Sequence, residues 1–373
     1  MMKQESKSAA VEQCAEIGVD QFDHIELLVG NALQASYYYH RGFGFDIVGY
    51  RGLQTGVRDA TSYVLRQNDI YLVVTSALTP DHQIAKHVQK HGDGVKCIGL
   101  RVKDARQSYE AALSRGAQGL IEPQTQEDEN GVFVSASIAT YGDTIHTFVE
   151  RENYKGGFAP GYKAVNERQN GNGLLSVDHV VGNVEVGRMD YWVDFYERVF
   201  GFHVIQRFGS KDIVTQYSAL LSTVMSSQNS KIKLPINEPF SAPRRSQIQE
   251  YLDYNSAPGV QHIAFSTDDI VGTVERLRKQ GIEFLSVPRA YYDALTDRVG
   301  QIDEDINLLA ELGILVDRES EGYLLQIFTK PVEDRPTLFF EVIQRKGASG
   351  FGKGNFKALF ESIEREQSRR GNL

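Results

Sequence analysis

Apolar residues recur along the chain at spacings typical of strands and helices, most clearly beyond residue 174. Residues 262–265 form a short apolar run that predicts a strand. Asp268 and Asp269 follow it and are suited to cap a helix, which Gly281 would end. The apolar positions of this helix fall on one face: Ile270, Val274 and Leu277.

Further strands and a terminal helix follow. Two apolar segments, 323–329 and 337–343, predict strands on either side of a turn that contains Pro331 and Pro336. The first half repeats the order of a strand, an amphipathic helix and several strands, so the pattern predicts an α+β fold with largely antiparallel sheets. The last segment has an apolar face at helical spacing, formed by Phe356, Leu359, Phe360 and Ile363.

An internal repeat supports this organisation. The segment GVQHIAFSTDDIVGTVERLRKQGIEFLSVP (259–288) aligns without a gap with GVKCIGLRVKDARQSYEAALSRGAQGLIEP (94–123). FDHI at 22–25 and VDHV at 177–180 form a second pair. Because a repeat needs a neighbour to bury its apolar face, we expect two homologous halves built from βαβββ modules. The identical positions of the long pair are Gly94/Gly259, Val95/Val260, Ile98/Ile263, Asp104/Asp269, Glu110/Glu275, Gly116/Gly281 and Pro123/Pro288.

The repeat and the composition together set the expected boundaries. Residues 153–173 lie in a polar, glycine-rich stretch that predicts a surface linker between the halves. The expected parts are a leader at 1–19, an N-terminal non-catalytic module at 20–152, the linker, and a C-terminal catalytic iron-binding module at 174–373 with a closing helix at 354–370.

Charge and cysteine content exclude several classes of protein. The formal net charge of −9 argues against a nucleic-acid groove, which needs a basic face. Cys14 and Cys97 can form at most one bridge, so the chain is not a disulfide scaffold. No apolar run is long enough for a membrane span, and the start has no apolar signal core. We therefore expect a soluble cytoplasmic protein.

Three residues of the second half have the chemistry of a mononuclear iron site. His179, His262 and Glu341 each lie in an apolar, strand-like setting, SVDHVV, GVQHIAF and LFFEVI. Two imidazoles and one carboxylate on one face leave the opposite coordination positions open for substrate and dioxygen. Burial of Glu341 is costly unless a cation neutralises it. Each histidine alone is more often a hydrogen-bonded core residue, but the three together predict a metal site.

The first half serves as an internal control. It retains His24 and has Glu150 as a candidate acid, but Cys97 stands where the second half has His262. We interpret this half as a scaffold that has lost its site, although a His/Cys/Glu set could hold zinc. His87 and His91 have a spacing that binds zinc when an acid joins them. No partner for the pair is evident, so we interpret them as exposed helix residues.

Several longer motifs resemble 4-hydroxyphenylpyruvate dioxygenase, a family of the vicinal-oxygen-chelate superfamily. The resemblance spans essentially the whole chain and is densest after residue 174. It implies an open barrel-like sheet in each half, Fe(II) bound by His179, His262 and Glu341, and conversion of 4-hydroxyphenylpyruvate and dioxygen to homogentisate and carbon dioxide in tyrosine catabolism. It further suggests a homo-oligomer, a dimer or tetramer. The motifs are LLSVDHVVGN, LPINEP, RRSQIQEYLDYN, GVQHIAF, GYLLQIFTKPVEDRPTLFFEVIQR and GFGKGNF.

The resemblance also implies a substrate pocket. Side chains alternate along a strand, so Phe339 should share the face of Glu341, and Gln326 that of Phe328. Gln261 should point away from His262 and support the metal strand. Catalytic roles are implied for Asn237, Gln247 and Gln326. Substrate contacts are implied for Ser218, Asn237, Gln247, Gln261, Gln326, Phe328, Phe339, Phe351 and Phe356.

Three other functions stay open at this point. Hydroxymandelate synthase resembles the same family and uses the same substrate, but it tends to carry a smaller aliphatic residue at the position of Phe328. A non-catalytic small-molecule-binding module of the same fold would not need three retained ligands. A ring-cleaving extradiol dioxygenase shares the fold and the triad but acts on catechols.

Overall fold

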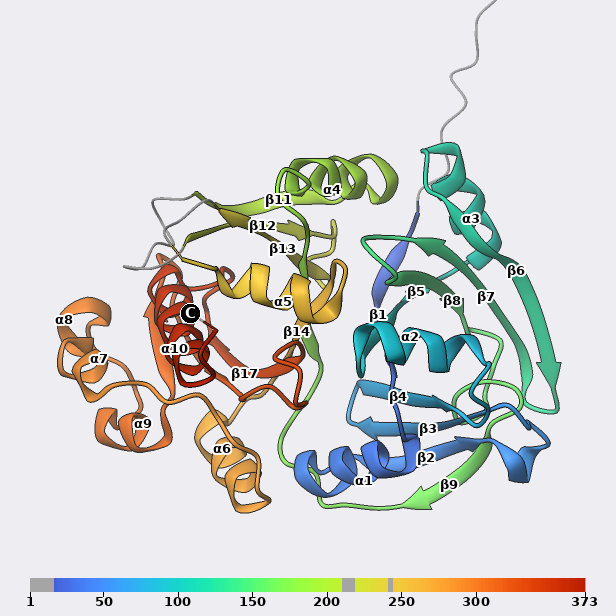
Figure 1. The fold of residues 1–373 in the computed structure, drawn as a ribbon, viewed down its shortest axis with the longest axis horizontal. Helices are drawn as coiled ribbons and strands as arrows, with labels where there is room; N and C mark the ends of the chain where they lie inside the picture. The colour runs from blue at the N-terminus through green and yellow to red at the C-terminus, as the bar shows by residue number, and fades with distance from the viewer. Residues whose placement is uncertain (1–16, 210–218, 241–243, 373) are drawn as a thin grey trace, which may run out of the picture.

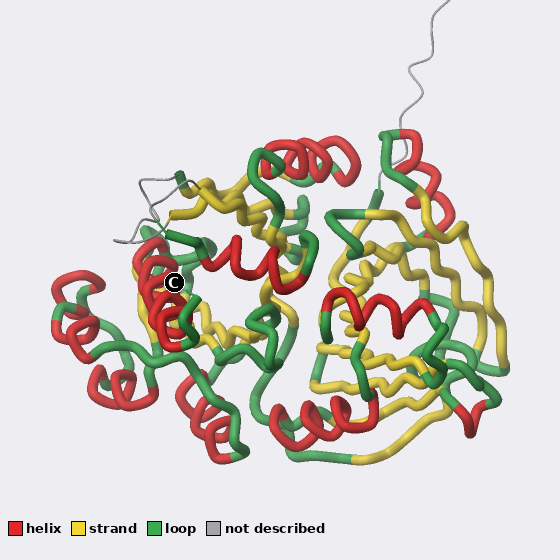
Figure 2. Tube along the Cα trace, viewed as in Figure 1, coloured by secondary structure: helices red, strands yellow, loops and turns green. Residues whose placement is uncertain are grey.

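The computed structural model describes residues 17–209, 219–240 and 244–372. They form two curved sheets that lie side by side, one from each half of the chain (Figure 1). Helices lie around the strands of each sheet (Figure 2). This confirms the α+β class and the two-half architecture. None of the helices in these ranges is long and apolar enough to cross a membrane.

The first half contains most of the strands of the nine-stranded sheet. Its elements are β1 (Val19–Leu28), α1 (Ala32–Phe43), β2 (Asp46–Arg51), β3 (Ala60–Gln67), β4 (Ile70–Ala77), α2 (Gln83–His91), β5 (Gly94–Val102), α3 (Ala105–Ser114), β6 (Gly119–Asp128), β7 (Gly131–Ala139), β8 (Ile145–Glu150) and β9 (Lys163–Glu167).

The second half contains the eight-stranded sheet. Its elements are β10 (Val177–Asn183), α4 (Met189–Phe195), β11 (His203–Phe208), β12 (Ala219–Ser226), β13 (Lys233–Phe240), α5 (Gln247–Asn255), β14 (Gly259–Ser266), α6 (Ile270–Lys279), α7 (Arg289–Asp293), α8 (Leu295–Val299), α9 (Ile306–Leu312), β15 (Leu315–Arg318), β16 (Tyr323–Phe328), β17 (Phe339–Lys346) and α10 (Lys353–Arg369).

The strand orders of the two sheets show the duplication directly. The first sheet has the order β6-β7-β8-β5-β1-β4-β3-β2-β9, and the second has β11-β12-β13-β10-β14-β17-β16-β15. Read in opposite directions, the orders coincide strand for strand from β1 and β10 outward. Both sheets are mixed, because β1 pairs with β4 and β10 with β13 in parallel. Each sheet therefore contains two copies of the βαβββ module.

The repeated helices begin and end for the same local reasons. Asp104 and Asp269 accept a hydrogen bond from a main-chain N–H in the first turn of α3 and α6, respectively. Such caps satisfy amide groups that the helix itself leaves unpaired. Gly116 and Gly281, just after the helices, have φ angles of 86° and 92°, a conformation that favours glycine. The capping aspartate and the glycine, which both repeats share, explain why the sequence alone located these helices.

Part of the predicted linker belongs to a sheet. β9 lies within residues 153–173 and pairs antiparallel with β2, at the edge of the first sheet. Of the predicted leader at 1–19, residues 1–16 lie outside the described ranges, and Val19 begins β1. The linker is therefore a mixture of loop and strand rather than loop alone.

The two halves share one apolar core. The Phe340 ring, on the second sheet, lies 5.1 Å from the ring of Phe43 and 5.7 Å from that of Tyr39, both on α1. Helix α10 lies at the open side of the second sheet (Figure 1), where Leu359 packs in one cluster with Phe328. The second sheet thus packs against the first half through Phe340 and against α10 through Phe328.

Candidate metal centre

His179, His262 and Glu341 come from three neighbouring strands. The strands lie in the order β10-β14-β17, and Ala264 of β14 pairs with both His179 and Glu341. His262 lies two residues before Ala264 on the same strand, and side chains two apart point to the same face. The sheet therefore brings together three residues that are far apart in sequence, as predicted.

The three side chains converge on one point inside the protein. Nε2 of His179 lies 3.1 Å from Oε2 of Glu341, and Nε2 of His262 lies 3.4 Å from the same oxygen. One donor atom from each of the three residues lies within 4.8 Å of the others. All three are buried, with at most 4% of their surface exposed. This spacing allows all three to bind a single ion.

Hydrogen bonds fix which nitrogen of each imidazole faces the carboxylate. Nδ1 of His179 lies 2.7 Å from Oδ1 of Asp178, and Nδ1 of His262 lies 3.1 Å from Oε1 of Gln261. Both partners accept hydrogen bonds, so each Nδ1 carries the proton and each Nε2 presents a lone pair to Glu341. Gln326 donates to Oε1 of Glu341 at 2.8 Å and directs Oε2 toward the histidines. Three buried lone-pair donors that face one another fit a cation.

The electrostatics of the cluster agree with this arrangement. Burial raises the pKa of Glu341, but His179 and His262 outweigh it and lower that pKa to about 2. Burial lowers the pKa of His179, but the carboxylates of Glu341 and Asp178 raise it above its usual value. Burial lowers the pKa of His262. Glu341 therefore stays ionised, and its negative charge favours a positive charge beside it, either a proton on His179 or a metal ion.

Asp178 and Arg345 support the centre and were missed in the sequence. Arg345 donates from Nε and Nη2 to the two carboxylate oxygens of Asp178, each at 2.8 Å. Burial raises the pKa of Asp178, but hydrogen bonds from Arg345 and His179 hold it well below its usual range. Asp178 therefore stays ionised and orients His179. The Asp-His pair that recurs in FDHI and VDHV was the sequence signal that could have indicated Asp178.

A small pocket opens beside the triad. Predicted residues Gln326, Phe328, Phe351 and Phe356 line it together with the triad. The ring of Phe351 lies 4.8 Å from that of His179. Predicted pocket residues from two separate segments, 326–328 and 351–356, thus meet beside the triad.

The remaining predicted pocket residues lie nearby or outside the described ranges. Gln247, Gln261 and Phe339 line a second cavity, and the ring of Phe339 stacks on His262 at 4.7 Å. Asn237 pairs in register with Asn183 of β10, and its amide donates to Oδ1 of Asn183 at 3.3 Å. Ser218 lies outside the described residues. Among those described, Oδ1 of Asn237 and Oε1 of Gln247 are buried without a hydrogen-bond partner.

The corresponding place in the first half has a different set of side chains. Gly99 pairs with Thr147 as Ala264 pairs with Glu341, so Thr147 occupies the carboxylate position. Sγ of Cys97 donates to Oγ1 of Thr147 at 3.0 Å. The candidate acid Glu150 was wrong, because its carboxylate instead accepts from the main-chain N–H at the start of α3.

The supporting ion pair is nevertheless kept in the first half. Arg151 donates from Nε and Nη2 to the two oxygens of Asp23, each at 2.7 Å, as Arg345 does to Asp178. Oδ1 of Asp23 lies 2.9 Å from Nδ1 of His24. The halves therefore share the support of the first histidine and differ in the two other ligand positions.

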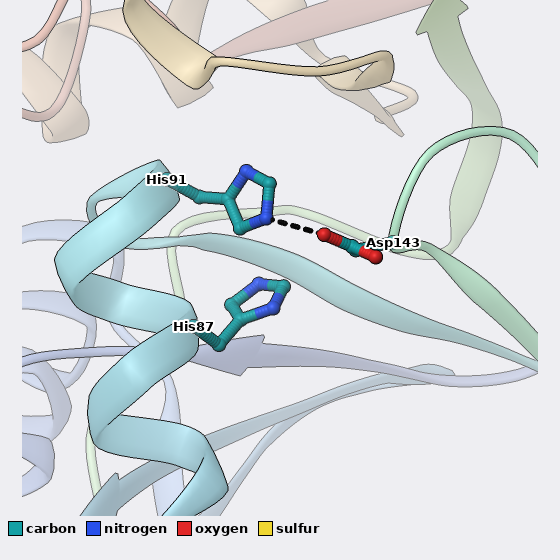
Figure 3. Close-up of side chains that lie close together, drawn as sticks. All are labelled: His87, His91 and Asp143. Carbon is teal, nitrogen blue, oxygen red and sulfur yellow. Dashed lines mark hydrogen bonds and ion pairs between the residues drawn. The ribbon is translucent and has the colours of Figure 1, made fainter.

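A second cluster contradicts one sequence interpretation. His91 is buried and His87 is half-buried, and Asp143, in the loop between β7 and β8, is the acid that the sequence did not reveal. Nε2 of His91 lies 2.8 Å from Oδ2 of Asp143 (Figure 3). Burial, with His91 and Lys96 nearby, lowers the pKa of His87 to about 4. These histidines are not simply exposed helix residues.

Comparisons with known proteins define the class first. Residues 176–327 match the family described as Glyoxalase/Bleomycin resistance protein/Dioxygenase superfamily. A triple mutant of 4-hydroxymandelate synthase from Streptomyces coelicolor has a similar structure, with a TM-score of 0.84, 33% identity, and coverage of 94% of this chain and 99% of that one. The fold and the buried triad thus define a member of this superfamily with a candidate metal site.

The particular family follows from two further findings. Residues 15–159 match the N-terminal family of hydroxyphenylpyruvate dioxygenase. The 4-hydroxyphenylpyruvate dioxygenase of Dictyostelium discoideum is 47% identical, covering 95% of this chain and 100% of that protein. That of Danio rerio is 48% identical, covering 94% and 92%. The chain belongs to the 4-hydroxyphenylpyruvate dioxygenase family.

Proposed function

We propose that this protein is an Fe(II)-dependent dioxygenase that converts 4-hydroxyphenylpyruvate and dioxygen to homogentisate and carbon dioxide in tyrosine catabolism. The observation that carries the proposal is the buried triad, in which two Nε2 lone pairs face one carboxylate oxygen. Similarity to dioxygenases named for this substrate, over nearly the whole chain, supports it.

In this proposal His179, His262 and Glu341 hold the iron. Two imidazoles and a carboxylate on one face are the donor set of non-heme Fe(II) oxygenases, and they leave positions open for substrate and dioxygen. The bound iron would supply the redox chemistry that activates dioxygen. The chain itself fixes the imidazole orientation through Asp178 and Gln261, and it fixes the carboxylate through Gln326.

The pocket residues would hold the substrate ring and exclude water. The rings of Phe328, Phe339 and Phe351 lie against the two histidines, within 6.1 Å between ring centroids. The unpaired amide oxygens of Asn237 and Gln247 suit hydrogen bonds from the substrate phenol, because a buried polar atom is costly without a partner. Orientation by these groups would supply much of the selectivity.

We further propose that α10 closes the pocket. Nδ2 of Asn355 on α10 donates to Oε1 of Gln326 at 2.8 Å, and Gln326 in turn binds Glu341. Arg370, just beyond the helix, donates to Oε2 of Glu250 on α5 at 2.8 Å. Truncation after Gly347 should therefore abolish turnover. Full activity of the truncated chain would show that the helix is not a lid.

One alternative function has a specific observation behind it. The structural similarity to 4-hydroxymandelate synthase extends over nearly the whole chain. That family tends to have a smaller aliphatic residue where Phe328 stands, and here the Phe328 ring lies 6.1 Å from His262, edge to face. Phe328 therefore favours attack on the substrate ring. Chromatography of the product against authentic homogentisate and hydroxymandelate separates the two activities.

The central test combines iron binding with product identification. Anaerobic titration with Fe(II) should show one iron per chain, and addition of 4-hydroxyphenylpyruvate and dioxygen should yield homogentisate. His179→Ala, His262→Ala and Glu341→Ala should each abolish both. Retained iron binding and turnover in all three variants would show that these residues do not form the iron site. If the iron-loaded wild type consumed no dioxygen, a non-catalytic binding module would be favoured. We also propose a cytoplasmic dimer or tetramer, which light scattering in solution tests for subunit number.

A further inference from the structure

His87, His91 and Asp143 form a second group of metal-type donors, on the side of α2 that faces the other half. The two histidines are one turn apart, and their ring centroids lie 4.4 Å apart. Both rings project from α2 toward the loop that carries Asp143 (Figure 3). One donor atom from each of the three residues lies within 4.8 Å of the others. The three donor atoms are thus close enough together to bind one ion, as are those of the triad in the second half.

The hydrogen bonds of His91 indicate that a cation can bind at its Nε2 atom. Nδ1 of His91 lies 2.6 Å from the carbonyl oxygen of Asn255, which can only accept, so Nδ1 carries the proton. Nε2 then faces Oδ2 of Asp143 at 2.8 Å. Two lone-pair donors at this distance need a proton or a metal ion between them. A histidine that binds a metal commonly donates its other N–H to a carbonyl in this way.

We propose that His87, His91 and Asp143 bind a divalent cation of the zinc type, separate from the iron centre. Two histidines at i and i+4 on a helix, with one carboxylate from elsewhere, supply three of the four ligands of a tetrahedral zinc ion. Asp143 is exposed, so water can take the fourth position and the ion can enter from solvent.

The site joins the two halves of the protein. His91 is the last residue of α2, whereas Asn255, its hydrogen-bond partner, is the last residue of α5. Arg335 donates to the carbonyl oxygens of Lys90 and Tyr254, at 2.8 and 3.2 Å, and bridges the same two helix ends. The first residue of α5 is Gln247, in the proposed substrate pocket. A bound ion would therefore hold α5 in place and stabilise the junction.

Lys90 competes with the ion for the carboxylate. Its Nζ donates to Oδ2 of Asp143 at 2.7 Å, the oxygen that His91 also faces. Because half of the Lys90 side chain is exposed, 52%, it can turn into solvent when an ion binds. Removing this lysine should tighten metal binding, whereas removing a ligand should abolish it. The opposite signs distinguish a metal site from a network of ion pairs.

The test uses the iron-loaded protein and cobalt(II) as the probe. Equilibrium dialysis followed by elemental analysis should show one cobalt per chain in addition to unchanged iron. Visible absorption should show the bands of four-coordinate cobalt. His87→Ala and Asp143→Asn should lose the cobalt and keep the iron, Lys90→Ala should bind it more tightly, and His203→Ala, at an exposed histidine on β11, should behave as the wild type. Circular dichroism checks that each variant is folded.

Three results would overturn the proposal: no cobalt retained by the iron-loaded protein, cobalt gained only as iron is lost, or equal cobalt in folded His87→Ala. No turnover is measured, so failure of the proposed dioxygenase activity leaves the readout intact. If the triad failed to hold iron, the loss of cobalt in His87→Ala would still report on this site alone.

Discussion

Replacement of Asp178 by asparagine isolates the role of the buried ion pair beneath the proposed iron site. The carboxylate accepts two hydrogen bonds from Arg345 at 2.8 Å, and its Oδ1 also lies 2.7 Å from Nδ1 of His179. Asparagine keeps the shape but removes the charge and one acceptor. Loss of a group that orients a metal-binding histidine costs about 10–100-fold in metal affinity. That corresponds to about 1.4–2.8 kcal/mol of binding free energy.

The same substitution should also destabilise the fold. Asp178 is buried, and removal of one partner of a buried ion pair costs about 3–5 kcal/mol because the other charge is left without compensation. Arg345 would be that charge. Chemical denaturation measures the free energy of unfolding, and anaerobic iron titration of the folded variant measures the affinity.

The first half supplies a matched control, Asp23→Asn. Asp23 accepts from Arg151 at 2.7 Å through both oxygens, and Arg101 donates to it as well. The two other ligand positions near His24 hold Cys97 and Thr147 rather than a second imidazole and a carboxylate. Both variants should lose stability, and only Asp178→Asn should lose iron affinity. The reasoning is refuted if Asp23→Asn weakens iron binding as much as Asp178→Asn, or if Asp178→Asn binds iron as tightly as the wild type.

Three further outcomes are expected. Burial lowers the pKa of His146 to about 4, so the unfolded chain binds the proton more readily and stability is lost as pH falls from about 6.5 to about 4. That loss, up to about 3 kcal/mol at 1.36 kcal/mol per pKa unit, should shrink in His146→Gln when urea unfolding is compared at the two pH values. Cys97→Ala removes the contact with Thr147 and should cost about 1 kcal/mol of stability, with iron affinity and turnover nearly unchanged. Phe328→Leu should shift part of the product from homogentisate toward hydroxymandelate in chromatography, because the ring beside His262 is lost.

Each of these has a clear contrary result. An unchanged pH dependence in His146→Gln would show that this imidazole binds a proton as readily in the folded protein as in the unfolded chain. Loss of iron binding in folded Cys97→Ala would overturn the view that the first half is a scaffold. An unaltered product in active Phe328→Leu would show that this ring does not direct the reaction.

Repetition made much of the fold predictable. The gapless alignment of 94–123 with 259–288 located corresponding strands and helices, and the contrast between Cys97 and His262 showed which half to examine. The alternation of side chains correctly separated Phe339, which stacks on His262, from Phe340, which packs against α1. These successes rest on local periodicity, which a sequence displays directly.

The failures come from features that periodicity does not contain. Glu150 was a candidate acid, but the register of β5 with β8 puts Thr147 opposite Gly99, and register depends on tertiary pairing. Asp143 lies in a loop 52 residues from His91 and could not be linked to it without the fold. The ion pair between Asp178 and Arg345 likewise joins two residues that are 167 positions apart in the sequence.

The measurement that tests the account most directly is a crystal structure of the anaerobic iron-loaded protein, with data collected at the iron absorption edge. The account expects one strong anomalous peak in the second half, bonded to Nε2 of His179, Nε2 of His262 and a carboxylate oxygen of Glu341, and none beside His24. Iron located elsewhere, or a peak that one of these three side chains does not contact, would contradict it.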